Sequence, residues 1–102
     1  GHGDAESARH AFQRVSAADP QDPRGWTLLA QACAALGDMA GEDSALTSAL
    51  KADPADLMAL LLRGKMAERR GDERLAAASY GAAATVAPSM DRLRPDLRPA
   101  VQ

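Results

Sequence analysis

The sequence predicts an all-α fold, an α-solenoid of antiparallel helix pairs with about five helices and a short C-terminal cap. The first observation is a repeat of 34 residues, because Gly-Asp pairs begin at residues 3, 37 and 71. Three prolines keep the same interval: Pro20, Pro54 and Pro88. The second observation is the composition, in which alanine is abundant and aromatic residues are scarce. Such a chain favours helices that pack close together.

The helices are expected between these markers. From each Gly-Asp pair to the next proline the sequence predicts one helix, over residues 5–18, 39–52 and 73–87. From each proline to the next Gly-Asp pair it predicts another, over residues 23–36 and 57–70. The unit is therefore a helix, a turn, a helix and a turn. We expect one domain at 3–88, with the second helix of a truncated repeat at 3–22 and complete repeats at 23–56 and 57–88.

Each marker has a physical role at a helix end. Glycine can adopt the left-handed conformation that closes a helix, and the aspartate after it can accept hydrogen bonds from the N–H groups of the next helix. Proline ends the second helix of a repeat, because it interrupts the backbone hydrogen bonding. Asp22 and Asp56 then stand 34 residues apart as N-caps, and Pro23 suits a first helical turn.

The tripeptide Arg70-Gly71-Asp72 is interpreted as a turn of this repeat and not as a cell-adhesion signal. Its Gly-Asp pair is the third copy of a turn whose other copies read His2-Gly3-Asp4 and Leu36-Gly37-Asp38. The arginine is incidental, because a histidine and a leucine stand at its position in the other copies.

Apolar residues at helical spacing predict the core. Four of them fall at offsets 0, 3, 4 and 7 on one helix face: Trp26, Leu29, Ala30 and Cys33. Three more share a face of the last helix: Ala76, Tyr80 and Ala83. Ala30 and Gly64 occupy corresponding places, where a small residue lets the paired helix come close.

The pattern resembles the tetratricopeptide repeat family, whose unit has 34 residues and ends before a proline. In the middle repeat the matching residues are Trp26, Leu29, Ala30, Cys33, Gly37, Leu46, Ala49 and Pro54. In the last repeat they are Leu60, Gly64, Ala67, Gly71, Ala76, Tyr80, Ala83 and Pro88. The N-terminal piece supplies Ala8, Phe12, Val15 and Pro20. Four pattern positions hold a residue type other than the family's usual one: Glu42 in place of a small alanine, Arg63 in place of an apolar residue, and Cys33 and Ala67 in place of tyrosine. The resemblance covers residues 3–88 and implies a right-handed helical solenoid.

The two ends depart from the repeat. Gly1-His2 is typical of a vector remnant, so we expect a piece of a longer protein. In this register the first helix of the first repeat is missing, and the exposed face of residues 5–15 is expected to associate with a second copy or to be covered by the tail. Residues 89–102 are expected to form a capping segment or a linker, because Pro95 and Pro99 interrupt what would be the first helix of a following repeat.

Composition and residue inventory exclude several functions. A net charge of −2 with interleaved arginines and acids argues against nucleic-acid binding. No apolar run is long enough to span a bilayer, and the lone Cys33 weakly favours a reducing compartment, so we expect a cytoplasmic protein. His10 has no Cys, Ser or carboxylate constellation around it in the pattern, so we expect no catalysis, no metal and no cofactor in this chain.

By resemblance, the first helix of each repeat lines a concave groove that holds extended or helical peptides. The groove positions fall at offsets 0, 3, 7 and 10: Arg24, Thr27, Gln31 and Ala34, then Met58, Leu61, Lys65 and Glu68, with Arg69 adjoining. The stretch "LMALLLRGK" has apolar residues all around its helix, so we expect a peptide, a second copy or a further domain to cover it. The basic groove residues would orient an acidic or C-terminal group of the partner.

The sequence thus predicts a non-catalytic module that binds a protein or peptide in a groove. A homodimer through the truncated repeat or through residues 57–62 is also open. The alternative function is an oligomerisation or positioning appendage of a larger enzyme. Residues 57–88 with the proline-rich tail resemble the repeats that precede the iron- and 2-oxoglutarate-dependent domain in bacterial proteins similar to aspartyl/asparaginyl β-hydroxylases. The iron ligands of such a domain are not among these 102 residues.

Overall fold

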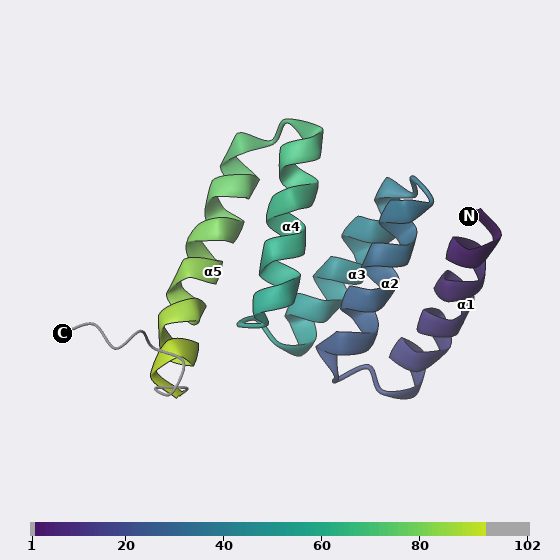
Figure 1. Ribbon diagram of the computed structural model, residues 1–102, viewed down its shortest axis with the longest axis horizontal. Helices are drawn as coiled ribbons and strands as arrows, with labels where there is room; N and C mark the ends of the chain where they lie inside the picture. The colour runs from purple at the N-terminus through teal and green to yellow at the C-terminus, as the bar shows by residue number, and fades with distance from the viewer. Residues whose placement is uncertain (1, 94–102) are drawn as a thin grey trace.

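The computed structural model describes the backbone of residues 2–93 and the side-chain surroundings of residues 3–87. Within that range the chain forms five α-helices and no strand (Figure 1). They are α1 (His2–Ala18), α2 (Pro23–Ala35), α3 (Met39–Ala52), α4 (Leu57–Arg70) and α5 (Glu73–Leu93). The prediction of an all-α array of antiparallel helix pairs is confirmed.

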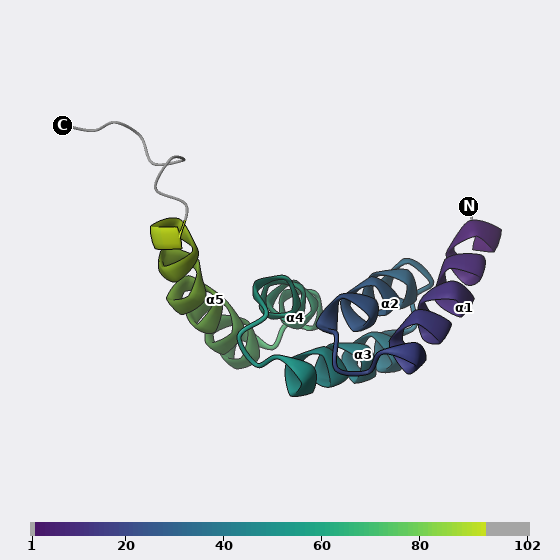
Figure 2. The ribbon, with the colours of Figure 1, turned by 90° about the horizontal axis from the view of Figure 1, so that it is seen from below.

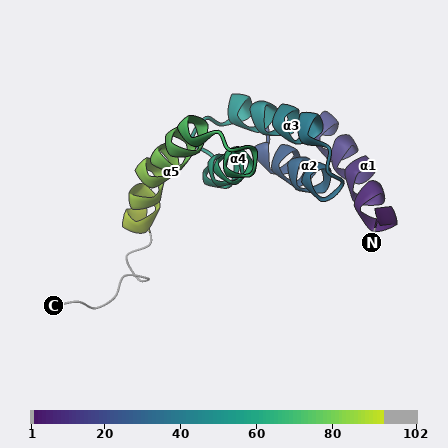
Figure 3. The same ribbon diagram turned by 90° about the horizontal axis from the view of Figure 1, so that it is seen from above.

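The helices form a curved array of two rows. Seen from below, α2 and α4 lie on the inner side of the curve, and α1, α3 and α5 form the outer side (Figure 2). The view from above gives the same arrangement (Figure 3). The Cα radius of gyration is 15.1 Å, whereas a compact domain of this length has a radius of about 13 Å. The elongation follows from each helix packing mainly on its neighbours in sequence.

Local caps place the helix ends where the sequence predicts them. The Oδ1 atom of Asp38 accepts a hydrogen bond from the N–H of Gly41 at 2.9 Å, and Asp72 caps α5 through the N–H of Leu75. Gly37 and Gly71 both have φ of 75°, the left-handed conformation that closes the preceding helix. The two other predicted N-caps, Asp22 and Asp56, also accept hydrogen bonds from the first turns of α2 and α4.

Two predicted helix boundaries are wrong. The first Gly-Asp pair, Gly3-Asp4, lies inside α1, which begins at His2, and not in a turn. Pro88 lies inside α5, which continues to Leu93. The earlier repeat differs at this point, because Asp53 precedes its proline and bonds the N–H of Ala55 at 3.0 Å in a local turn. The alanine before Pro88 has no side chain that could make that bond. The segment 89–102 was predicted to be a cap or a linker; its residues 89–93 continue α5, and residues 94–102 lie outside the described residues.

The core runs between the two rows. Of the seven residues that the spacing predicts, five are buried and two, Trp26 and Tyr80, are half-buried. The buried cluster of the core consists of Leu29, Ala30, Cys33, Ala45, Leu46 and Met66. Half-buried apolar residues pack against it: Phe12, Trp26, Leu62 and Leu75. Because the cluster has members on α2, α3 and α4, it joins these three helices.

Both charged departures from the family pattern have a partner on a neighbouring helix. Glu42 of α3 is only 4% exposed and forms an ion pair with Arg69 of α4. Arg63 of α4 donates from Nε to the hydroxyl of the buried Ser79 of α5 at 2.9 Å. A buried polar group costs free energy unless it is hydrogen-bonded, and these contacts remove that cost.

Candidate partner-binding surface

The inner row presents the only predicted site, the groove lined by α2 and α4. The nine predicted positions do not share one environment. Five of them are exposed or half-buried, and their side chains make no hydrogen bond or ion pair inside residues 3–87: Gln31, Ala34, Met58, Leu61 and Lys65. On α4 these positions lie three and four residues apart, so Met58, Leu61 and Lys65 share one side of the helix.

Three charged positions are already engaged within the chain. The guanidinium of Arg24 donates hydrogen bonds to the carboxylate of Asp22. Nε lies 3.0 Å from Oδ1 and 3.1 Å from Oδ2, and Nη2 lies 2.6 Å from Oδ2. Glu68 accepts a hydrogen bond from the hydroxyl of Tyr80 at 2.7 Å. Arg69 pairs with the buried Glu42. Of the three predicted basic groove residues, Lys65 alone makes no ion pair with another residue in the range 3–87.

The structure places Thr27 inside the molecule, where it is 5% exposed and its hydroxyl donates to the carbonyl of Arg24 at 3.0 Å. Its neighbour Leu28 is 40% exposed and was not among the predicted site residues. Adjacent leucines at 28 and 29 were the available signal, since one helix face cannot bury both. Leu29 is buried, which leaves Leu28 on the surface of α2.

A shallow, open hollow of ≈ 470 Å³ adjoins the N-terminal end of α4. It is lined by Asp53, Ala55, Asp56, Leu57, Met58 and Val86. Two acidic residues therefore line the same hollow as Met58, and one oxygen of each accepts a backbone hydrogen bond, Asp53 from Ala55 and Asp56 from Ala59. A second open hollow of ≈ 470 Å³ lies beside Trp26, whose indole N–H donates to the carbonyl of Pro20 at 3.0 Å. The second hollow lies near the α1–α2 connection and was not predicted.

The lone cysteine lies in the core. Cys33 is buried, and burial, followed by the negative charge of Asp38, raises the pKa of its thiol above the ordinary value of 9.0. A thiol with a raised pKa carries little thiolate at neutral pH, and the thiolate is the reactive form. In the described part of the chain no three His, Cys, Asp or Glu residues gather as a metal site. Nor does any helix there have the length and apolarity to cross a membrane.

Comparison with known proteins identifies the repeat. No match was found among curated proteins or among solved structures. The sequence model described as tetratricopeptide repeat matches residues 1–42 and 44–91. Repeats of this kind generally mediate protein–protein interaction, and the match includes both complete helix pairs. The chain belongs to the tetratricopeptide repeat family.

Proposed function

We propose that the chain binds a segment of a partner protein along the inner side of α2 and α4. We call this surface the groove and define it by Leu28, Gln31, Met58, Leu61 and Lys65. The observation that carries the proposal is the exposure of Met58, which is 51% on the inner-row helix α4. Together with Leu61 and Leu28 it makes an apolar surface on the concave side, and water-exposed apolar surface of this kind favours a covering partner.

The charges around the groove indicate which charges a complementary partner segment carries. Lys65 lies seven residues from Met58 along α4, a distance of about 10 Å. At the other end, the carboxylates of Asp53 and Asp56 line the hollow beside Met58. A complementary segment has an apolar side chain over Met58, a basic group toward the two aspartates and an acidic group toward Lys65. Opposite charges at the two ends would fix the direction in which the segment lies.

The purified chain, immobilised and incubated with cell lysate, tests this proposal. Met58→Glu and Lys65→Glu should each reduce capture of the same bound proteins, because the first charges the apolar contact and the second reverses the groove cation. The matched control for the lysine is Lys51→Glu, an exposed lysine of the outer-row helix α3 with the same change of net charge. The matched control for Met58→Glu is Ala84→Glu, which adds a carboxylate to the exposed side of α5. Equal capture by the wild type and all four variants would remove the groove as the binding surface.

A second surface favours self-association through α1. Ala45 and Ala49 of α3 are buried, with exposures of 2% and 0%. Their counterparts on α1, Ala11 and Val15, are exposed, and Val15 is 50% exposed. We infer that a second copy covers this face. Light scattering at rising concentration tests the inference: the wild type should dimerise and Val15→Glu should stay monomeric, whereas a wild type that remains monomeric contradicts it.

The appendage function stays a prediction. The family match covers only the repeats, and no contact among the described residues points to a particular catalytic domain. The reading frame beyond residue 102 decides between a free-standing interaction module and a repeat region attached to an enzyme similar to β-hydroxylases.

A further inference from the structure

The two junctions between successive helix pairs are built differently. At the first, α1 packs closely along α2, and a Cβ atom placed on Gly25 would lie 3.1 Å from the Cα atom of Ser16. One repeat later the corresponding residues are Ala59 and Leu50, which are both larger. The contact between α3 and α4 is correspondingly less extensive than that between α1 and α2. Backbone-to-backbone packing therefore holds the first junction more tightly than the second.

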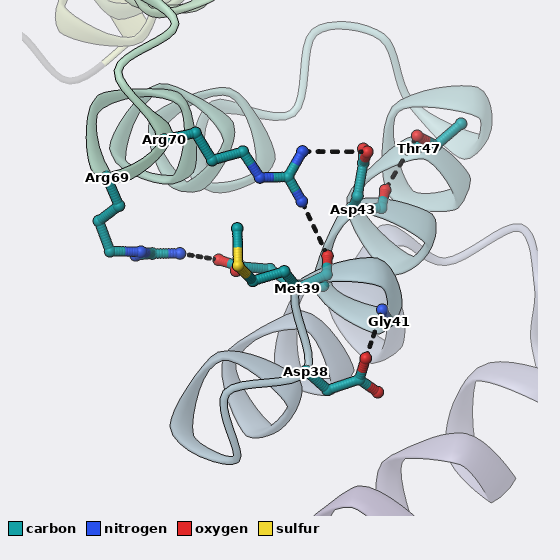
Figure 4. A network of polar contacts seen from close by, with 8 residues as sticks. Asp38, Met39, Gly41, Asp43, Thr47, Arg69 and Arg70 are labelled. Carbon is teal, nitrogen blue, oxygen red and sulfur yellow. Dashed lines mark hydrogen bonds and ion pairs between the residues drawn. The ribbon is translucent and has the colours of Figure 1, made fainter.

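Charged side chains bridge the second junction. Arg69 pairs with Glu42, and Arg70 contacts both the carboxylate of Asp43 at 3.4 Å and the carbonyl of Met39 at 3.0 Å (Figure 4). We call these contacts the ionic junction. The residues 34 positions earlier cannot form it, since Ala8 and Ala35 replace Glu42 and Arg69. At the earlier connection one ion pair is present, between Arg9 of α1 and Asp38 at 3.5 Å. The pairing of two successive arginines with two successive acidic residues is found between α4 and α3.

Few other contacts fix the angle at this connection. In the described chain the backbones of α3 and α5 do not come close to each other, and α2 approaches α4 over a short stretch. The apolar link across the connection includes Met66, whose side chain is flexible and adapts to different packing arrangements. Each ion pair has one member that is more than half exposed, Arg69 at 54% and Asp43 at 51%, so salt can screen part of the attraction. A small interface joined by ion pairs is a suitable place for a hinge between two rigid helix pairs.

We propose that the ionic junction sets the angle between the α2–α3 pair and the α4–α5 pair, and that the angle changes when its charges are screened or removed. Because α2 and α4 carry opposite sides of the groove, the angle sets the spacing between Gln31 and Lys65. This part of the inference rests on the proposed groove, and it adds that ionic strength regulates the width of the groove. The hinge itself is a property of the free chain and can be measured without a partner.

Distance measurement between two spin labels tests the hinge. Ser7→Cys on α1 and Ala84→Cys on α5 place labels on exposed positions outside the ionic junction, while the buried Cys33 is shielded from labelling. In low salt the labelled wild type should give one narrow distance distribution. In about 1 M salt, where the Debye length is about 3 Å, the mean distance should shift and the distribution should broaden. Arg69→Ala combined with Arg70→Ala should produce the same shift already in low salt.

Three further variants keep the test decisive. Arg74→Ala removes an exposed arginine of α5 that forms no ion pair within residues 3–87, and it should leave the distribution unchanged. Exchanging the charges in Asp43→Arg with Arg70→Asp should restore the narrow distribution lost in Arg70→Ala. If the double arginine variant unfolds, Glu42→Gln removes the charge while keeping the shape of the side chain, and should show the same shift. A distribution that is insensitive to salt and to these changes, or that responds equally to Arg74→Ala, would overturn the proposal. Loss of lysate capture bears on the groove alone and leaves this measurement unaffected.

Discussion

Gly64 of α4 lies directly against the ring of Tyr80 of α5: a Cβ atom at residue 64 would lie 2.6 Å from Cε1 of the tyrosine. The hydroxyl of the same tyrosine donates to Glu68 one helical turn further along α4. The ring is thus held at both ends, by the bare backbone of the glycine and by the carboxylate. This contact explains why α4 and α5 pack as a close pair.

Gly64→Ala should destabilise the fold by up to about 2 kcal/mol in total, because the added methyl group overpacks the contact with Tyr80 at a cost of about 1–3 kcal/mol. The higher helix propensity of alanine, about 1 kcal/mol, offsets only part of this loss. Urea unfolding followed by circular dichroism measures the free energy of unfolding of the variant and the wild type.

Gly81→Ala is the matched control. Gly81 lies inside α5, and a Cβ atom there would meet nothing within 4 Å. Only the propensity gain remains, so the variant should be more stable than the wild type by about 0.5–1 kcal/mol. Equal effects of the two alanine substitutions would mean that Tyr80 yields to the methyl group without cost.

The sequence predicts the helices well because their ends depend on local chemistry. The start of α3 requires a residue whose side chain accepts a hydrogen bond from an N–H group of the first turn. Asp38 does this, and the bond does not depend on how α3 packs against other helices. Pro88 shows the limit of this reasoning. A proline can lie inside a helix, and whether it ends one depends on the residue before it, which is Asp53 before Pro54 and an alanine before Pro88.

The site was less predictable, because side-chain pairing is a tertiary property. Arg24 and Lys65 occupy equivalent kinds of positions in the pattern, yet the arginine is committed to Asp22 and the lysine makes no ion pair in the described range. The burial of Thr27 likewise depends on how neighbouring helices approach α2. Helical spacing gives the side of a helix on which a residue lies, but not the partner that it meets there.

Arg69→Ala should lower the free energy of unfolding by about 1–3 kcal/mol, because the buried carboxylate of Glu42 loses its charged partner. Adding Glu42→Ala should recover much of that loss, since alanine occupies the corresponding positions of α1 and α5, at residues 8 and 76. A double-mutant cycle in urea isolates the coupling between the two side chains. If the double variant loses the sum of the single losses, the two residues are independent and Glu42 is not stabilised by the arginine.

Acid unfolding should report on Asp22. Hydrogen bonds from the side chain and the backbone N–H of Arg24 lower the pKa of Asp22 from 3.8 to about 2. A carboxylate with a lowered pKa in the folded state stabilises the fold above pH 3.8, and this contribution is lost as the pH falls toward 2. The pKa should be visible in an NMR titration of the Asp22 side chain. Asp22→Asn should remove this part of the pH dependence, whereas an Asp22 that titrates near pH 4 would contradict the pairing.

Alkaline titration should report on Tyr80, the only tyrosine of the chain. The hydrogen bond to Glu68, together with burial and the charge of that carboxylate, raises the pKa of the phenol above 10.0. Because the folded-state pKa is raised, the stabilisation is fully present below pH 10 and is lost as the pH rises through the folded-state value. Absorbance of the ionised phenol near 295 nm measures that value without interference from another tyrosine. Glu68→Gln should bring the pKa back toward 10, because the amide cannot repel the phenolate as a carboxylate does; an unchanged pKa in this variant would show that burial alone causes the shift.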